Sequence, residues 1–148
     1  MALRRVIPAL LALLALGGDS SWCADKSPFA VVVNNESKLS KISDDDLLRI
    51  YLGKKTLWEE TGTRIQPALL EEEQQVAQAF LESTLKKSVS QYRAYWKRLL
   101  FSGGGSAPRT FRTSAQVIDF VTRQPGAIGV VESSAADAAR VKVLDVTN

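Results

Sequence analysis

The chain has 148 residues, of which 19 are basic and 16 acidic, so the formal net charge is only +3. It contains no histidine, the commonest general base at neutral pH and the commonest metal ligand, and its single cysteine is Cys23. This composition excludes zinc and copper sites, and it excludes Ser-His or Cys-His nucleophiles. The basic residues are too scattered to follow a nucleic-acid backbone. We therefore expect no metal, cofactor or nucleic-acid partner.

The first residues are arranged as in an export signal. Arg4 and Arg5 precede 11 consecutive apolar residues, 6–16, and a polar, turn-prone stretch follows them. A membrane-spanning helix needs roughly 20 apolar residues, whereas this stretch is shorter and contains Pro8. We therefore predict a cleaved signal rather than an anchor, and a periplasmic or secreted mature chain without a membrane span.

The signal is expected to end near Cys23. We place it at residues 1–23, with cleavage after Ala24 as the alternative. Cys23 also leaves lipid attachment open, because lipoprotein signals end in a cysteine, but bulky Trp22 stands where such signals carry a small residue. Residues 24–148 suffice for one domain with a single core, and they hold 17 basic and 15 acidic residues, a net charge of +2.

Two patterns define the first elements of this domain. Residues 29–33 are a continuous, mostly β-branched apolar run, which is typical of a strand buried on both faces. Ser43 followed by three aspartates predicts a helix start, because a hydroxyl caps free amides and carboxylates favour the positive end of the helix dipole. Gly53 supplies the end of this helix. A cation site at residues 44–46 is the alternative interpretation.

The next two elements are a strand and a helix. Residues 64–69 alternate as in a strand, and Pro67, which has no amide proton, indicates an edge position. Residues 71–85 have apolar side chains at helical spacing, and we expect the three glutamates at 71–73 to lie in the first turn of this helix.

A further helix follows, capped by Ser88 or Ser90. It carries Tyr92 and Trp96 on an apolar stripe. Aromatic residues at this spacing usually pack the interior, so we assign both to the core, with ligand stacking as the alternative.

The best candidate for an anion site lies after a glycine-rich loop. Residues 102–108 contain three consecutive glycines and match neither phosphate-loop spacing nor a dinucleotide fingerprint, so we interpret them as a flexible linker. Arg109, Arg112, Thr113 and Ser114 are expected at the start of the following helix, where two guanidinium groups would lie beside free amides. The alternative is solvated arginines beside an ordinary serine cap.

The last quarter of the chain predicts a turn at residues 124–126 and a buried strand at 127–131, in which Gly129 allows close approach of another backbone. A short alanine-rich helix at 133–140 and a strand at 141–146 complete the pattern. Strands and helices alternate without a repeat, so the fold class is α/β, with helices covering a mixed sheet.

Four segments together resemble the phosphate-type periplasmic solute-binding proteins of ABC importers: residues 29–34, 47–58 (LLRIYLGKKTLW), 92–96 (YRAYW) and 125–131 (PGAIGVV). The similarity spans about residues 30–132 and is closest to short relatives that contain one such domain. It implies a type II periplasmic-binding fold, normally two α/β lobes that close on a ligand. This chain would supply a single lobe.

One segment departs from that family. In full-length members, a Ser-Gly-Thr segment at a helix start donates hydrogen bonds to phosphate, whereas the matching place here, after Leu69 and Leu70, holds the glutamates at 71–73. These carboxylates would repel an oxyanion. A buried phosphate also needs donors on nearly all sides, so the resemblance implies weak binding, or binding completed by a homodimer or another envelope protein.

We therefore predict a non-catalytic periplasmic solute-binding-like protein, similar to the phosphate-binding component of ABC importers, with weak or partner-dependent anion binding at Arg109, Arg112, Thr113 and Ser114. The alternative is an envelope interaction, structural or sensory accessory domain that kept the fold and lost the small ligand. The third hypothesis, an enzyme with paired carboxylates at 71–73 or 44–46, is not needed to explain acids at a helix start.

Overall fold

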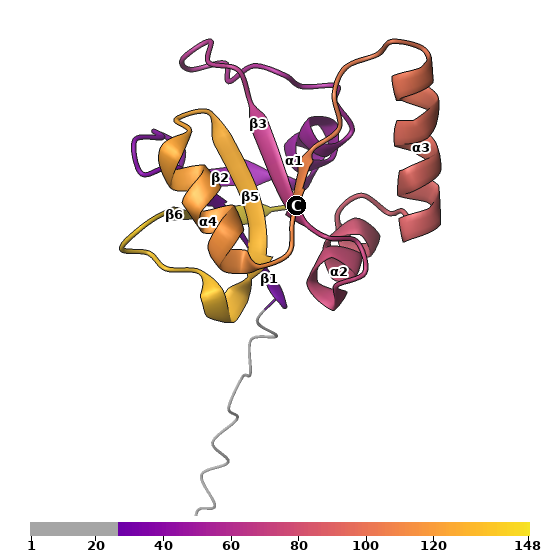
Figure 1. Cartoon of the computed structure of the whole chain (residues 1–148). Coiled ribbons are helices and arrows are strands. Elements are labelled where there is room, and N and C mark those ends of the chain that lie inside the picture. The colour runs from indigo at the N-terminus through magenta and orange to yellow at the C-terminus, as the bar shows by residue number, and fades with distance from the viewer. Residues whose placement is uncertain (1–26) are drawn as a thin grey trace, which may run out of the picture.

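A computed structural model describes residues 27–148, so the predicted signal at 1–23, Cys23 and the start of the mature chain at 24 lie outside the described residues. The described chain forms a six-stranded sheet flanked by helices (Figure 1). Its elements, in chain order, are β1 (Phe29–Val33), β2 (Lys41–Ser43), α1 (Asp44–Tyr51), β3 (Gln66–Leu70), α2 (Gln75–Ser83), α3 (Val89–Phe101), β4 (Arg109–Phe111), α4 (Ser114–Arg123), β5 (Ala127–Glu132), a 3-10 turn (Ser133–Ala135) and β6 (Lys142–Thr147).

The sheet is mixed, as predicted, with the strand order β2-β6-β1-β5-β3-β4. β1 runs antiparallel to both of its neighbours, β5 and β6, while all other pairs are parallel. Five strands therefore share one direction, and their carboxyl ends meet at one edge of the sheet. Helix α4 packs on one face, α1 and α2 pack on the other, and α3 lies outside α2 (Figure 1).

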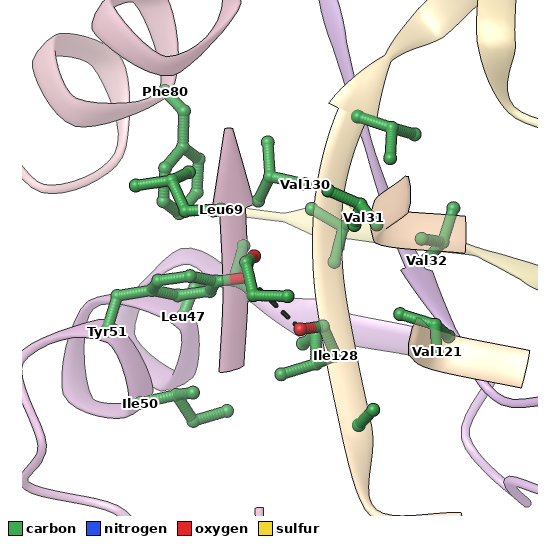
Figure 2. Close-up of a cluster of buried hydrophobic side chains, with 14 of the residues drawn as sticks. Val31, Val32, Leu47, Ile50, Tyr51, Leu69, Phe80, Val121, Ile128 and Val130 are labelled. Carbon is green, nitrogen blue, oxygen red and sulfur yellow. Dashed lines mark hydrogen bonds between the residues drawn. The ribbon is translucent and has the colours of Figure 1, made fainter. Parts of the chain in front are cut away.

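The core lies on both faces of the central strands. Phe80 is fully buried and makes edge-to-face contacts with Phe29 and Tyr51, at ring-centroid distances of 5.3 and 4.9 Å. The Tyr51 hydroxyl donates a hydrogen bond to the carbonyl of Ala68 at 2.8 Å, and burial raises the pKa of this phenol well above its usual value. Figure 2 shows the Tyr51 ring among the apolar side chains of this cluster.

Two predicted helix starts are confirmed. The Ser43 hydroxyl accepts a hydrogen bond from the Asp46 amide, and Ser88 forms a reciprocal capping box with Gln91. A third was misplaced, because α2 begins at Gln75 and its first turn contains no acid. The glutamates at 71–73 instead occupy the turn between β3 and α2.

Three further expectations were wrong. β4 is a short strand that pairs with β3, so Arg109 lies in a strand and not at a helix start. β4 is therefore the edge strand and β3 is internal; Pro67 is tolerated because the pairing with β4 begins only at Ala68. Residues 133–140 form a single 3-10 turn and no longer helix.

Glycines also act differently from the prediction at two places. The loop after α3 is no plain linker, because Gly103, at φ +76°, and Gly104 donate to the carbonyls of Leu100 and Leu99 and so end the helix. At Gly129 the close approach comes from α4, since an added Cβ would lie 2.6 Å from Cγ1 of Val117.

Within residues 27–148, no helix is both long enough and apolar enough to span a bilayer.

Candidate functional site

An open groove lies between edge strand β4 and helix α4. Its volume is about 690 Å³. All three residues of β4 line the groove. α4 lines it with side chains that recur every three or four positions along one helix face. Residues just after β3, β4 and α4 complete the lining. The lining residues are Glu71, Arg109, Thr110, Phe111, Arg112, Gln116, Asp119, Phe120, Arg123 and Gln124.

The groove is cationic. Of its two acids, Asp119 is bound by Arg140, a residue that does not line the groove, and the hydrogen bond from Arg140 lowers the pKa of Asp119. Glu71 lies 3.6 Å from Nε of Arg112, a weak and exposed ion pair. Arg109 and Arg123 form no ion pair within residues 27–148. The guanidinium groups of Arg109 and Arg123 are therefore able to meet an anion, although Arg123 also attracts the Asp119 carboxylate, whose pKa it lowers.

Aromatic side chains form the floor of the groove. Phe111 of β4 and Phe120 of α4 lie 5.4 Å apart between ring centroids. The Arg109 guanidinium lies 5.4 Å from the centroid of the Phe120 ring, a cation–π contact that holds this side chain over the groove.

The four predicted site residues fall into two groups. Arg109 and Arg112 line the groove. Thr113 is the N-cap of α4 and accepts a hydrogen bond from the Gln116 amide, and Ser114 accepts one from the Glu132 amide. The cap is thus threonine, not the serine that we expected. The Thr113 hydroxyl caps α4, and the Ser114 hydroxyl ties the start of α4 to β5.

Arg123 is the groove cation that the sequence analysis did not single out. It lies in the last turn of α4, where a cation is commonly explained by the helix dipole. Arg123 lies four residues after Asp119, so both side chains lie on the same face of the helix. Because strand β4 was not predicted, the sequence did not indicate that this face would border a groove.

The cap leads to a stability prediction. Thr113→Ala should lower the free energy of unfolding by about 1 kcal/mol, because the Gln116 amide loses its acceptor. Thr113→Ser keeps the acceptor and should retain most of this stability in urea unfolding. Equal losses for the two variants would show that the methyl group, and not the cap, contributes the stability.

The turn after β3 is the place where the family resemblance puts phosphate. Here Arg93 of α3 donates to both Glu72 and Glu73. The Glu72 side chain is only 16% exposed, so its charge is held partly inside the protein by this pair. The protein's own carboxylates thus occupy the guanidinium that an external anion would need.

Hydrogen bonds in this cluster shift the pKa values of two of its groups. A backbone hydrogen bond and then Arg93 lower the pKa of Glu73, and the hydrogen bonds that Arg93 donates to both glutamates raise the pKa of Arg93. The charged forms of Glu73 and Arg93 are therefore favoured, and the turn presents an ion-pair cluster in which one guanidinium pairs with two carboxylates.

The other candidate sites from the sequence, the aspartates at 44–46 and the aromatic residues of α3, lie in ion pairs or in the core. Asp46 pairs with Lys55 at 2.9 Å and Asp45 with Arg49 at 3.9 Å. Within the described residues, no three His, Cys, Asp or Glu side chains gather closely enough to hold a metal ion. Tyr92 and Trp96 are 3% and 5% exposed, which confirms their assignment to the core.

Comparison with known proteins identifies the fold. No family model matches the chain, and no curated protein matches it. Solved structures do match. They include an ABC-type phosphate transport receptor from Vibrio cholerae (TM-score 0.63, 19% identity), a putative phosphate ABC transporter substrate-binding protein with bound phosphate from Clostridium perfringens (0.65, 18%) and PstS from Borrelia burgdorferi (0.59, 14%).

These alignments cover 80%, 80% and 82% of this chain, but only 46%, 44% and 47% of the three proteins. The chain thus spans less than half the length of the receptors that it matches. At these identities the likeness establishes the fold alone: the described residues form one α/β lobe of the periplasmic-binding type.

Proposed function

We propose that this protein is a non-catalytic binding protein of the cell envelope, which recognises an anionic group in the groove between β4 and α4. The observation that carries the proposal is the pair of unpaired guanidinium groups, Arg109 and Arg123, in an open groove on a lobe shared with phosphate receptors. The export signal predicted at residues 1–23 supports a periplasmic location.

The groove favours weak binding. It is open to solvent on one side, and its arginines are exposed, so their attraction for an anion is screened by water and salt. A phosphate-like group would exchange readily unless a second surface covered it. We therefore expect millimolar affinity for the free ion, and tighter binding where a second copy or an envelope protein supplies the other wall.

Calorimetric titration with phosphate and sulfate tests this proposal. Arg109→Ala and Arg123→Ala should each weaken binding about fivefold, because each removes roughly 1 kcal/mol of attraction near the surface. Arg98→Ala, which removes an exposed arginine of α3, is the matched control and should have no effect. If Arg98→Ala weakened binding as much as the groove variants, the site would lie elsewhere.

The ion-pair cluster at residues 71–73 favours a second candidate, a lobe whose main role is contact with another envelope protein. It would show as a folded protein that binds neither phosphate nor sulfate and yet retains one envelope protein in a pull-down. Micromolar capture of phosphate by the monomer would contradict both candidates, because neither provides an enclosed site.

A further inference from the structure

Helix α3 exposes two large apolar side chains, Leu100 and Phe101, at its C-terminal end. Phe101 is 84% exposed, the highest value among the large hydrophobic residues that the structure exposes, and Leu100 is 50% exposed. The dimple between them has a volume of about 240 Å³ and is lined only by Lys97, Leu100 and Phe101. These side chains therefore project from the surface and do not form a deep pocket.

The charged side chains that α3 itself places near this apolar tip are all basic. α3 contains Arg93, Lys97 and Arg98 and no acidic residue. Lys97 and Arg98 precede Phe101 by four and three positions, so both lie next to it on the helix surface. Neither forms an ion pair within residues 27–148. From residue 83 to residue 118 the sequence has seven basic residues and no acid.

The position of the helix leaves this surface accessible. α3 stands at the outer side of the molecule, beyond α2, and its buried face is fixed by Tyr92 and Trp96 (Figure 1). Tyr95 also donates to the carbonyl of Leu52 at 2.6 Å. Because the inner face is anchored, the outer face with Lys97, Arg98 and Phe101 is presented on a rigid helix.

We propose that the outer face of α3 docks on an anionic lipid surface. Phe101 and Leu100 would enter the boundary between headgroups and acyl chains, while Lys97 and Arg98 contact lipid phosphates, as in interfacial amphipathic helices. A protruding apolar tip with two adjacent cations fits a lipid surface better than a protein partner, whose binding energy usually comes from side chains seated in pockets.

Sedimentation with vesicles of phosphatidylglycerol and phosphatidylethanolamine tests this inference. We expect binding to these vesicles and much weaker binding to neutral phosphatidylcholine vesicles. Each surface cation contributes about fivefold to partitioning, so Lys97→Ala/Arg98→Ala should reduce it about 25-fold. Phe101→Ser should also reduce partitioning into the vesicles. It should leave the salt dependence of partitioning unchanged, because it removes no charge.

Matched controls keep the result specific. Lys38→Ala/Lys41→Ala removes two exposed lysines elsewhere, and Leu57→Ser removes an apolar side chain that is 53% exposed on another segment; both should bind like the unchanged chain. Residues 6–16 are apolar and identical in every variant, so only differences between variants are interpreted. Failure to bind anionic vesicles, or equal binding by all variants, would overturn the proposal and leave the tip to a protein partner.

Discussion

Replacing Gly126 by alanine should lower the free energy of unfolding by about 3 kcal/mol and the melting temperature by about 10 °C. An added Cβ would lie under 3.0 Å from the carbonyl oxygen of Arg64, closer than real Cβ atoms approach, and this oxygen belongs to backbone that cannot rotate away. The segments that contain Arg64 and Gly126 must therefore move apart where β3 and β5 begin to pair.

That separation affects two hydrogen bonds. The Gly126 carbonyl accepts from the Gln66 amide at 3.0 Å and from Nε1 of buried Trp58 at 3.1 Å. The first bond opens the β3–β5 pairing, and the second holds Trp58 in the core. Each contributes about 1 kcal/mol, and the steric strain adds a similar amount or more.

Gly62→Ala is the control for Gly126→Ala. Gly62 has φ +67° and no heavy atom within 4 Å of an added Cβ, so alanine there meets only the conformational penalty of about 1 kcal/mol. Chemical denaturation of both variants compares the two costs. A loss at Gly126 no larger than that at Gly62 would show that the two strands move apart freely.

Local signals explain which parts of the fold could be predicted. A capping serine predicted the starts of α1 and α3, and a continuous apolar run predicted β1. These elements could be predicted because each pattern depends only on residues that are close together in the sequence. The strands β2 and β4 have three residues each, and only pairing with β6 and β3 makes them strands. No local pattern encodes that pairing, so both were missed.

In the candidate site, too, local features could be predicted from the sequence and contacts between distant residues could not. Arg109 and Arg112 were found because they are close in sequence, but the position of Arg109 was wrong since β4 was not expected. The ion pairs of Arg93 with Glu72 and Glu73 join residues 21 and 20 positions apart. The sequence showed that these carboxylates would oppose an anion, but not that α3 would bring an arginine to pair with Glu72 and Glu73.

The cluster around Arg93 gives the second large effect. Glu72→Gln/Glu73→Gln should strengthen phosphate binding by about 25-fold, because it removes two carboxylates and releases one guanidinium. Even with the full screening of water, each removed charge is worth about 1 kcal/mol, or about fivefold, at a separation near 4 Å. The released Arg93 would add a hydrogen-bond donor at this turn.

The measurement is a phosphate titration of this double variant beside Glu60→Gln/Glu82→Gln. The control removes the same total charge from exposed glutamates that form no ion pair within residues 27–148. A gain confined to Glu72→Gln/Glu73→Gln means that local carboxylates suppress binding at this turn. An equal gain in the control would assign the effect to net charge, and no gain in either would show that a single lobe lacks too many donors for charge removal to restore the site.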